Sequence, residues 1–134
     1  MGMSAVATIW RDGPSAFAFL VDDWDFLGPE LVESGLAYHR VGLHVHLEVW
    51  AWKSEAGIST RVNDGNGRSA PLDCLYVACG LGTAQAVPES WGGLHTIRRR
   101  IAQHAAALRK VVPFLMAPTA AELLKQCTGG RALD

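Results

Sequence analysis

The sequence has no excess of charge of either sign and no long apolar run. It carries 12 Lys and Arg against 13 Asp and Glu, a net charge of -1. A dedicated nucleic-acid binder needs a clear basic excess for its phosphate contacts, so this balance argues against one. No apolar run approaches the roughly 18 residues that a membrane span requires. We therefore expect neither nucleic acid nor a membrane as a partner.

Cysteine is also scarce, with 3 in 134 residues. An odd number cannot pair completely within one chain, and the N-terminal segment lacks the charged region and apolar core of a signal peptide. These features predict a reducing, cytoplasmic environment. We expect all of the cysteines to act as small buried hydrophobic residues: Cys74, Cys79 and Cys127.

The short motifs of common nucleophile and metalloprotease sites are missing as well. The chain contains no G-x-S-x-G, S-x-x-K or H-E-x-x-H pattern. Gly65-Asn66-Gly67 and Gly80-Leu81-Gly82 lack the context and the Lys of a phosphate-binding loop and are read as turns. We assign no catalytic residue and expect no cofactor and no metal.

Apolar material, in contrast, is ample. The chain is 49% hydrophobic and 19% charged, which excludes a disordered protein. A chain of this length typically buries roughly two-thirds of its unfolded surface. We predict a single domain over residues 1–134, with loose termini at 1–13 and 129–134.

The clearest pattern is an alternation of period two along residues 41–52. Apolar residues (Val41, Leu43, Val45, Leu47, Val49, Ala51) alternate with a mixed set (Gly42, His44, His46, Glu48, Trp50, Trp52). This pattern indicates a strand with one apolar face. One strand over 36–52 would exceed the usual length, so we place a turn at Gly42 between strands 36–41 and 43–52. A strand at 58–62 and a short one at 31–32 complete an antiparallel meander of three to four strands.

Apolar residues at helical spacing predict an N-terminal helix and several C-terminal ones. The expected helices cover residues 15–26, 72–79, 93–112 or slightly beyond, and 118–127, with loops at 63–71 and 80–92. Pro113 ends or kinks the long helix, which buries Ile101 and Leu108 and exposes Arg99. We predict an α+β fold with the helices packed on one face of the sheet.

The mixed face of strand 43–52 carries the candidate partner-binding residues: His44, His46, Glu48, Trp50 and Trp52. Aromatic side chains beside charged groups are typical of an interface centre. Two imidazoles and a carboxylate on one face can also chelate zinc or iron. The sequence shows no second ligand pair, and His39 or His95 would serve only if the fold brought them near. The alternatives are a plain exposed polar face and tryptophans that a neighbouring loop or the helix at 118–127 covers.

Other polar features have two interpretations each. His104 interrupts the apolar seam of the long helix, as a buried catalytic histidine or as a histidine at the edge of the seam with a backbone partner. Arg98, Arg99 and Arg100 spread around that helix and favour a solvated face over nucleic-acid contact. Residues 1–62 carry four basic and eight acidic side chains, residues 63–134 eight and five. Such asymmetry marks a binding surface, with Asp22, Asp23 and Asp25 steering a basic partner, or two halves that face each other.

Several segments in this order resemble a group of small bacterial α+β proteins of the polymorphic-toxin immunity type. They are Phe17-Ala18-Phe19-Leu20-Val21 with Phe26, the strands around 43–62, Pro71-Leu72-Asp73-Cys74-Leu75, and the helix with Ala105 and Leu108-Arg109. The resemblance spans about residues 15–116; Trp50-Ala51-Trp52 and the segment after Pro118 depart from it. It implies a bacterial inhibitor that binds a protein partner.

We therefore expect a non-catalytic, cytoplasmic binding protein whose partner is another protein, such as a toxin, or a second copy of the chain. The alternative is a small-molecule-binding domain or small enzyme. Its pocket would lie between the sheet and the helices and would use His44, His46 or His104.

Overall fold

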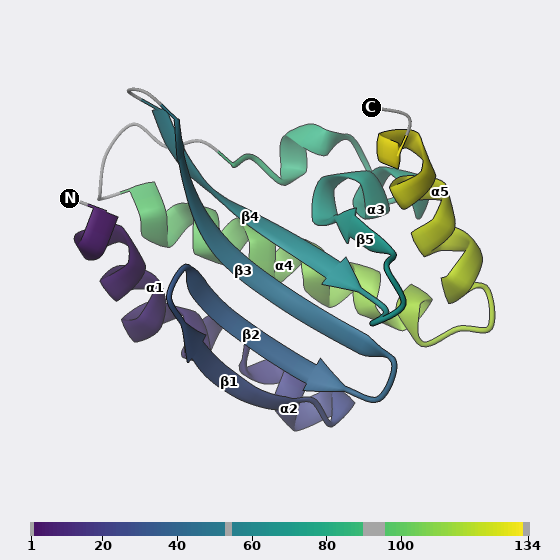
Figure 1. Cartoon of the computed structure of the whole chain (residues 1–134), viewed down its shortest axis with the longest axis horizontal. Helices are drawn as coiled ribbons and strands as arrows, with labels where there is room; N and C mark the ends of the chain where they lie inside the picture. The colour runs from purple at the N-terminus through teal and green to yellow at the C-terminus, as the bar shows by residue number, and fades with distance from the viewer. Residues whose placement is uncertain (1, 53–54, 90–95, 133–134) are drawn as a thin grey trace.

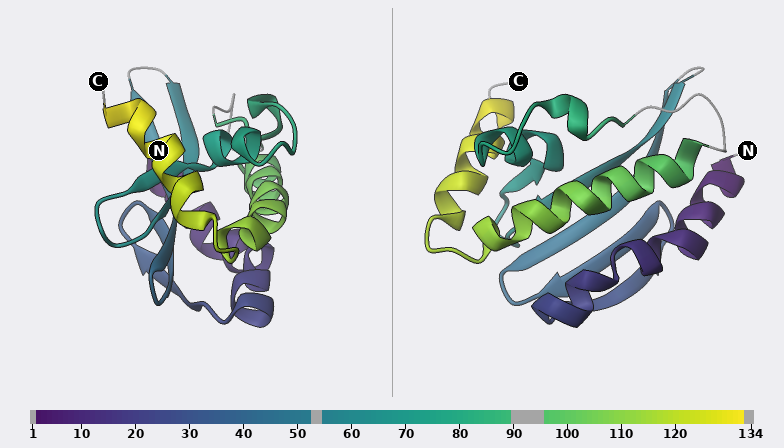
Figure 2. Two further views of the ribbon diagram at one scale, coloured as in Figure 1. Left: turned by 90° about the vertical axis from the view of Figure 1, so that its right-hand side faces the viewer. Right: turned by 180° about the vertical axis from the view of Figure 1, so that it is seen from behind.

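The computed structural model describes residues 2–52, 55–89 and 96–132, with side chains described for 5–50, 56–89 and 96–128. The elements are α1 (Gly2–Ala16), α2 (Ala18–Trp24), β1 (Leu27–Val32), β2 (Gly35–Arg40), β3 (Leu43–Trp52), β4 (Glu55–Asn63), β5 (Ser69–Pro71), α3 (Leu72–Ala78), η1 (Ala84–Ala86), α4 (Ile97–Leu115) and α5 (Ala120–Ala132). The strands form one antiparallel sheet in the order β1-β2-β3-β4-β5. α1, α2 and α4 lie behind the sheet, and α3 and α5 close its β5 end (Figures 1 and 2). The predicted α+β class is confirmed.

The meander forms as its alternation predicts, but it has one strand more than expected. Gly42, at φ 75°, makes the turn between β2 and β3. β5 lies within the stretch 63–71 that we expected to be a loop. The loop proper is organised by Asp64, whose Oδ1 accepts the backbone N–H groups of Asn66 and Arg68 at 2.8 and 3.2 Å. The sheet therefore has five strands, and the expectation of three to four is wrong.

Three expectations near the chain ends also differ from the structure. α1 occupies the expected loose terminus 1–13 from Gly2 onward, because Ala5 and Ile9 are buried in the core. The helix expected at 15–26 is instead the end of α1 followed by the short α2. At the other end, α5 continues to Ala132, into the expected loose tail.

The long helix α4 buries the predicted seam. Ile101 and Leu108 are 2% and 0% exposed, and Arg99 is exposed. Pro113 does not end the helix, since α4 runs to Leu115, slightly beyond residue 112. Pro113 cannot donate to the carbonyl of Arg109, but both residues are exposed, so water can hydrate that carbonyl. None of the described helices is long and apolar enough to cross a membrane.

The core fills the space between the sheet and the helices. Its largest fully buried side chains are Tyr38, Phe17, Phe26, Ile9, Leu20, Leu36, Leu47, Ile58, Leu72, Leu75, Ile97 and Ile101. These residues come from both the inner face of the sheet and the helices behind it. The apolar side chains of alternate strand positions therefore pack against the helices, as their period predicts.

The cysteines differ from the prediction. Cys74 of α3 and Cys127 of α5 form a disulfide, with their Cα atoms 5.8 Å apart. Cys79 is free, and partial burial raises the pKa of its thiol. The expectation that all three act as unpaired hydrophobic residues is therefore wrong for Cys74 and Cys127. An odd cysteine count allowed one pair, and the fold supplies it by placing α5 against α3.

Candidate functional site

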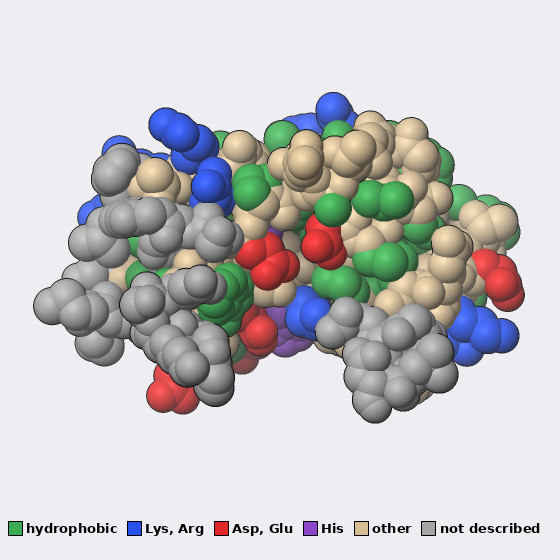
Figure 3. All heavy atoms as spheres, turned by 90° about the horizontal axis from the view of Figure 1, so that it is seen from above, with side chains coloured by type: hydrophobic (Ala, Val, Ile, Leu, Met, Phe, Trp, Pro, Cys, Tyr) green, Lys and Arg blue, Asp and Glu red, His purple; other side chains and the backbone are tan. Residues whose placement is uncertain are grey.

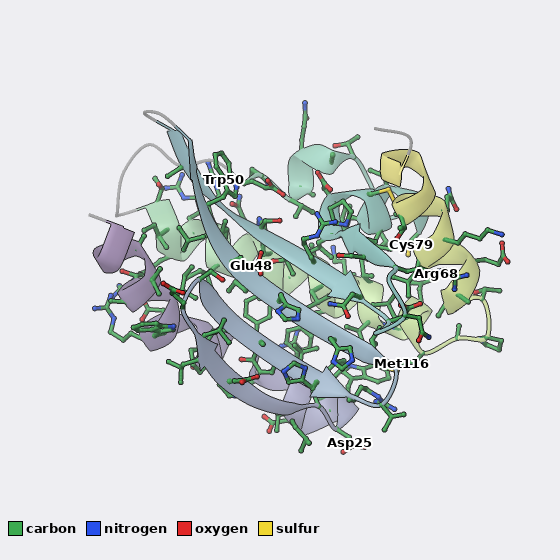
Figure 4. All side chains as sticks on the ribbon, in the orientation of Figure 1. Asp25, Glu48, Trp50, Arg68, Cys79 and Met116 are labelled. Atoms are coloured by element: carbon green, nitrogen blue, oxygen red, sulfur yellow. A yellow bond between two sulfur atoms is a disulfide. The ribbon has the colours of Figure 1, made fainter. Side chains whose placement is uncertain are left out.

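The face of the sheet turned away from α1, α2 and α4 carries the predicted partner-binding residues. We call it the open face, because none of the described helices covers it (Figures 1 and 2). His44, His46, Glu48 and Trp50 of β3 lie on it half-buried, as the alternation predicts. Figure 4 shows Glu48 and Trp50 on β3, on the near side of the sheet. The side chain of Trp52, like His95, falls outside the described residues.

Neighbouring strands add polar groups to this face. The register places His39 of β2 opposite His44, and Arg61 and Ser59 of β4 opposite His46 and Glu48. Arg61 is held in place because its Nε donates to Ser69 Oγ at 3.1 Å and its Nη2 to the Ser69 carbonyl at 3.2 Å. Figure 3 shows acidic, histidine and basic side chains close together along the edge of the view where the open face lies.

A chain of hydrogen bonds crosses the first three strands of the open face. The Nε2 of His39 lies 3.0 Å from Glu30 Oε1, and its Nδ1 lies 2.9 Å from the Nδ1 of His44. A carboxylate only accepts, so His39 carries a proton on Nε2. One further proton then joins the two Nδ1 atoms. The fold thus brings His39 to the predicted site. The sequence alone could not decide whether it would lie there.

The geometry of this pair is that of a hydrogen bond. The ring centres of His39 and His44 are 5.1 Å apart, and their Nδ1 atoms are 2.9 Å apart. The difference between these two distances is about two ring radii. Both Nδ1 atoms therefore lie near the line that joins the ring centres, with their lone-pair axes opposed, as in a straight N–H···N bond. Metal ligands would instead aim at a common point beside that line. No group of three or more His, Cys, Asp or Glu side chains in the described part of the chain could hold a metal ion.

His46 lies beside this pair, and its pKa is shifted by its surroundings. Its ring centre is 6.0 Å from that of His39. Burial lowers the pKa of His46, the Glu48 carboxylate raises it, and the neighbouring His39 and His44 lower it further. The net effect is a lowered pKa, so His46 is a neutral imidazole at neutral pH.

Trp50 is packed against the chain itself. A Cβ at Gly57, which is opposite it on β4, would lie 2.6 Å from Trp50 Cζ2, so only glycine leaves room for the indole. The segment at Glu89 runs alongside, because the backbone N–H of Ile58 donates to the Glu89 carbonyl at 2.9 Å. Trp50 is consequently half-buried, between the two alternatives that the sequence left open.

Glu89 brings a further carboxyl group to this end of the site. Burial and the Asp73 carboxylate raise its pKa, and the Trp50 indole, Arg61 and Ser59 lower it, leaving it raised overall. The Trp50 Nε1 is buried and has no hydrogen bond to a described residue, so its attraction for this carboxyl is a longer electrostatic one. Sequence reasoning missed Glu89 because it lies in an irregular segment. Arg61 could have been found from its alternation with Thr60 and Val62.

His104 is separated from the open face. It is 0% exposed on α4, behind the sheet. Its Nε2 donates to the Pro88 carbonyl and its Nδ1 accepts from Thr60 Oγ1, both at 2.8 Å. Burial lowers the pKa of His104, which keeps the ring neutral and in this tautomer. His104 therefore anchors the 83–89 segment, and the fold does not bring it together with His44 or His46.

Two ion pairs join distant parts of the sequence. Arg98 of α4 lies 3.0 Å from Asp12 of α1, and Arg109 lies 4.0 Å from Asp23. Each pair joins the acidic first part of the sequence to the basic second part. The charge asymmetry thus fits two parts of one domain that face each other.

Comparison with protein-family models, with curated proteins and with solved structures finds no match to this chain. The geometry of the open face therefore carries the functional argument alone.

Proposed function

We propose that the protein is a non-catalytic binding protein that docks a protein partner on the open face. The observation that carries the proposal is the network of fixed polar side chains on a sheet surface that none of the described helices covers. Carboxylate, imidazole and guanidinium groups stand there beside the Trp50 indole, from Glu30 of β1 to Arg61 of β4. A mixed set of this kind gives specificity through complementary charges.

The network is ordered before any partner arrives. Glu30 fixes His39, His39 fixes His44, and the Ser69 contacts fix Arg61. Side chains that are already ordered lose little conformational entropy on binding. The open face thus has the preorganisation expected of a docking surface.

A macromolecule fits this site better than a small ligand does. Three surface hollows of about 420, 270 and 250 Å³ lie around α3, the β2–β3 turn and α5. His44, His46, Glu48 and Trp50 line none of the three. The space between sheet and helices, where a ligand pocket was the alternative, holds the packed core. None of these three hollows thus offers the four side chains to a small ligand, and a contact with another surface suits them better.

The resemblance to immunity-type proteins extends the proposal to a bacterial inhibitor whose partner is a toxin. The alternative partner is a second copy of the chain. Disulfides are rare in the cytoplasm, so in that compartment Cys74 and Cys127 would be reduced to free thiols. Neither cysteine lies on the open face, and the docking proposal holds for both redox states.

The decisive variant reverses a charge at the centre of the open face. Tagged wild-type protein, Glu48→Lys and the matched control Glu122→Lys, on the exposed side of α5, are used to capture partners from the native host. The captured protein is then purified and titrated calorimetrically against each form, with circular dichroism to verify folding. We expect Glu122→Lys to bind like the wild type and Glu48→Lys to bind at least about tenfold more weakly, a loss of about 1.4 kcal/mol.

Two results would contradict the proposal. Equal affinity of the two variants for the partner would show that the docking surface lies elsewhere on the protein. No captured partner, together with a monomer at all concentrations in sedimentation velocity, would remove both the heterologous partner and self-association. Glu48 is a cleaner probe than Trp50, because truncating Trp50 would also remove its packing over Gly57.

A further inference from the structure

The two histidines at the centre of the open face share a hydrogen bond that allows only one proton between them. His39 and His44 are directly opposite on β2 and β3, and their Nδ1 atoms are 2.9 Å apart along the line that joins the rings. Two N–H groups cannot face each other at that distance, and neither can two bare lone pairs without loss of the bond. The state of this contact is therefore set by the number of protons on the pair.

The protons can be assigned one at a time. In the neutral pair, His39 carries its proton on Nε2, against Glu30, and His44 carries its proton on Nδ1, against His39. The first added proton goes to the Nε2 of His44, and the bridge becomes a stronger, charge-assisted bond. The second added proton needs the Nδ1 of His39, which places two cations and two donors face to face. At that step the bridge is lost.

We propose that the His39–His44 pair is a proton-operated switch in the open face, closed by one shared proton and opened when both rings become cationic. Histidine is the side chain whose charge normally changes near neutral pH, so mild acid operates the switch. The proposal adds regulation to the docking surface and rests on the proposed function only for its consequence. The switch itself is a property of the free chain.

The ring that moves is His44. His39 keeps its Glu30 contact in both states, because its Nε2–H still donates to the carboxylate. The Nε2 of His44 lies beside Gly65, where a Cβ would be 3.4 Å away, and Gly65 belongs to an exposed loop. Opening thus raises the charge of the pair from one positive charge to two and breaks the link between β2 and β3 side chains.

Charged side chains surround the pair on several elements. From β1, the Glu30 carboxylate lies 3.0 Å from the Nε2 of His39, and from β3, His46 and Glu48 lie on the same face. From β4, Arg61 lies opposite His46. In the β4–β5 loop, Asp64 is occupied by the N–H groups of Asn66 and Arg68 and by the Arg68 guanidinium. The Glu30 carboxylate therefore holds the Nε2–H of His39, while two N–H donors cannot share the space between the Nδ1 atoms.

Nuclear magnetic resonance of the full chain with 15N-labelled histidine tests the switch without any partner. At pH 7 we expect a scalar coupling between the two Nδ1 nuclei, which only a bridging hydrogen bond transmits. Between pH 8 and pH 4 we expect both rings to respond together in two separate steps, with the coupling lost in the second. Absence of the coupling at pH 7, or independent single steps for the two rings, would overturn the proposal.

Variants separate the switch from a general effect of charge. In His39→Gln, His44 should titrate in one step, and the same should hold for His39 in His44→Gln. His46→Gln should keep the coupling and both steps, because its ring takes no part in the bridge. A wild-type coupling that survives in His39→Gln would overturn the assignment of the pair. Failure of the Glu48→Lys capture experiment leaves these results untouched, so the two proposals can fail separately.

Discussion

His104 illustrates at the residue scale why a histidine in an apolar seam was ambiguous from sequence. Helical spacing placed it correctly at a buried position, but spacing says nothing about the partners of its nitrogens. Those partners, Thr60 and the Pro88 carbonyl, come from β4 and from an irregular segment distant in sequence. The structure thus gives His104 the backbone partner of one interpretation, but at a fully buried position rather than at the edge of the seam.

Replacing His104 should destabilise the fold. His104→Ala leaves Thr60 Oγ1 and the Pro88 carbonyl without their partner and opens a cavity, so we expect a loss of about 3 kcal/mol in urea melts. Arg99→Ala, on the exposed side of the same helix, is the control and should change little. A loss of less than about 1 kcal/mol at His104 would contradict the anchoring role.

His104 also makes the stability of the fold depend on pH. Its pKa is lowered in the folded state from 6.5, so the unfolded chain takes up a proton first as the pH falls. The contribution of neutral His104 is therefore complete above about pH 6.5 and declines below it, towards the folded-state pKa. Wild type and His104→Ala should converge in stability as urea melts move from pH 7.5 to pH 5.

Glu89 should have the opposite effect on how the stability of the fold depends on pH. Its pKa is raised in the folded state from 4.5, so ionisation favours the unfolded chain once the pH exceeds that value. Glu89→Gln removes this penalty while keeping the side-chain shape. We expect the variant to be more stable than the wild type at pH 7 and equal to it at pH 4 in thermal melts. A variant less stable at pH 7 would show that the Arg61 and Ser59 contacts outweigh burial.

At the element scale, the sequence predicted the elements whose pattern is long and regular. The period-two run of β3 gave its face, its turn at Gly42 and its neighbour β4, because every second side chain is buried. β5 was missed because three residues, Ser69–Pro71, are too few for a period to show and lie among turn formers. α1 was missed because its pairing with α4, rather than a capping pattern, stabilises it.

The long helix offers a test of this reading of periodicity. Leu108 is fully buried on the seam of α4, so Leu108→Ala should cost about 2–5 kcal/mol in denaturant melts. The exposed Arg99 supplies the comparison, since Arg99→Ala should stay within about 0.5 kcal/mol of the wild type. Similar losses at both positions would mean that the helix face is assigned incorrectly.

At the scale of the whole molecule, the site depends on contacts between strands that a single sequence does not reveal. The alternation of β3 predicted His44, His46, Glu48 and Trp50 on one face, but it could not pair His44 with a particular neighbour. That pairing requires the register between β2 and β3, which the length of the Gly42 turn fixes. The sequence thus predicted the composition of the site, and the register supplied its hydrogen-bond chain.

The disulfide connects α3 and α5 at the β5 end of the molecule, and its reduction should loosen that end first. Cys74 and Cys127 are separated by 53 residues, and a loop of this size constrains the unfolded chain by about 4 kcal/mol in the chain-entropy model. α5 is otherwise held mainly by the buried Leu124 and by the Thr128 hydroxyl, which donates to the Ser69 carbonyl at 3.2 Å. Reduction should therefore lower the free energy of unfolding by about 3–4 kcal/mol and speed amide hydrogen exchange in α5 and β5 before β2 and β3. The double variant Cys74→Ala, Cys127→Ala should behave like the reduced wild type. Adding reductant should change neither its free energy of unfolding nor its hydrogen exchange. Unchanged exchange in α5 after reduction would show that packing alone holds this helix.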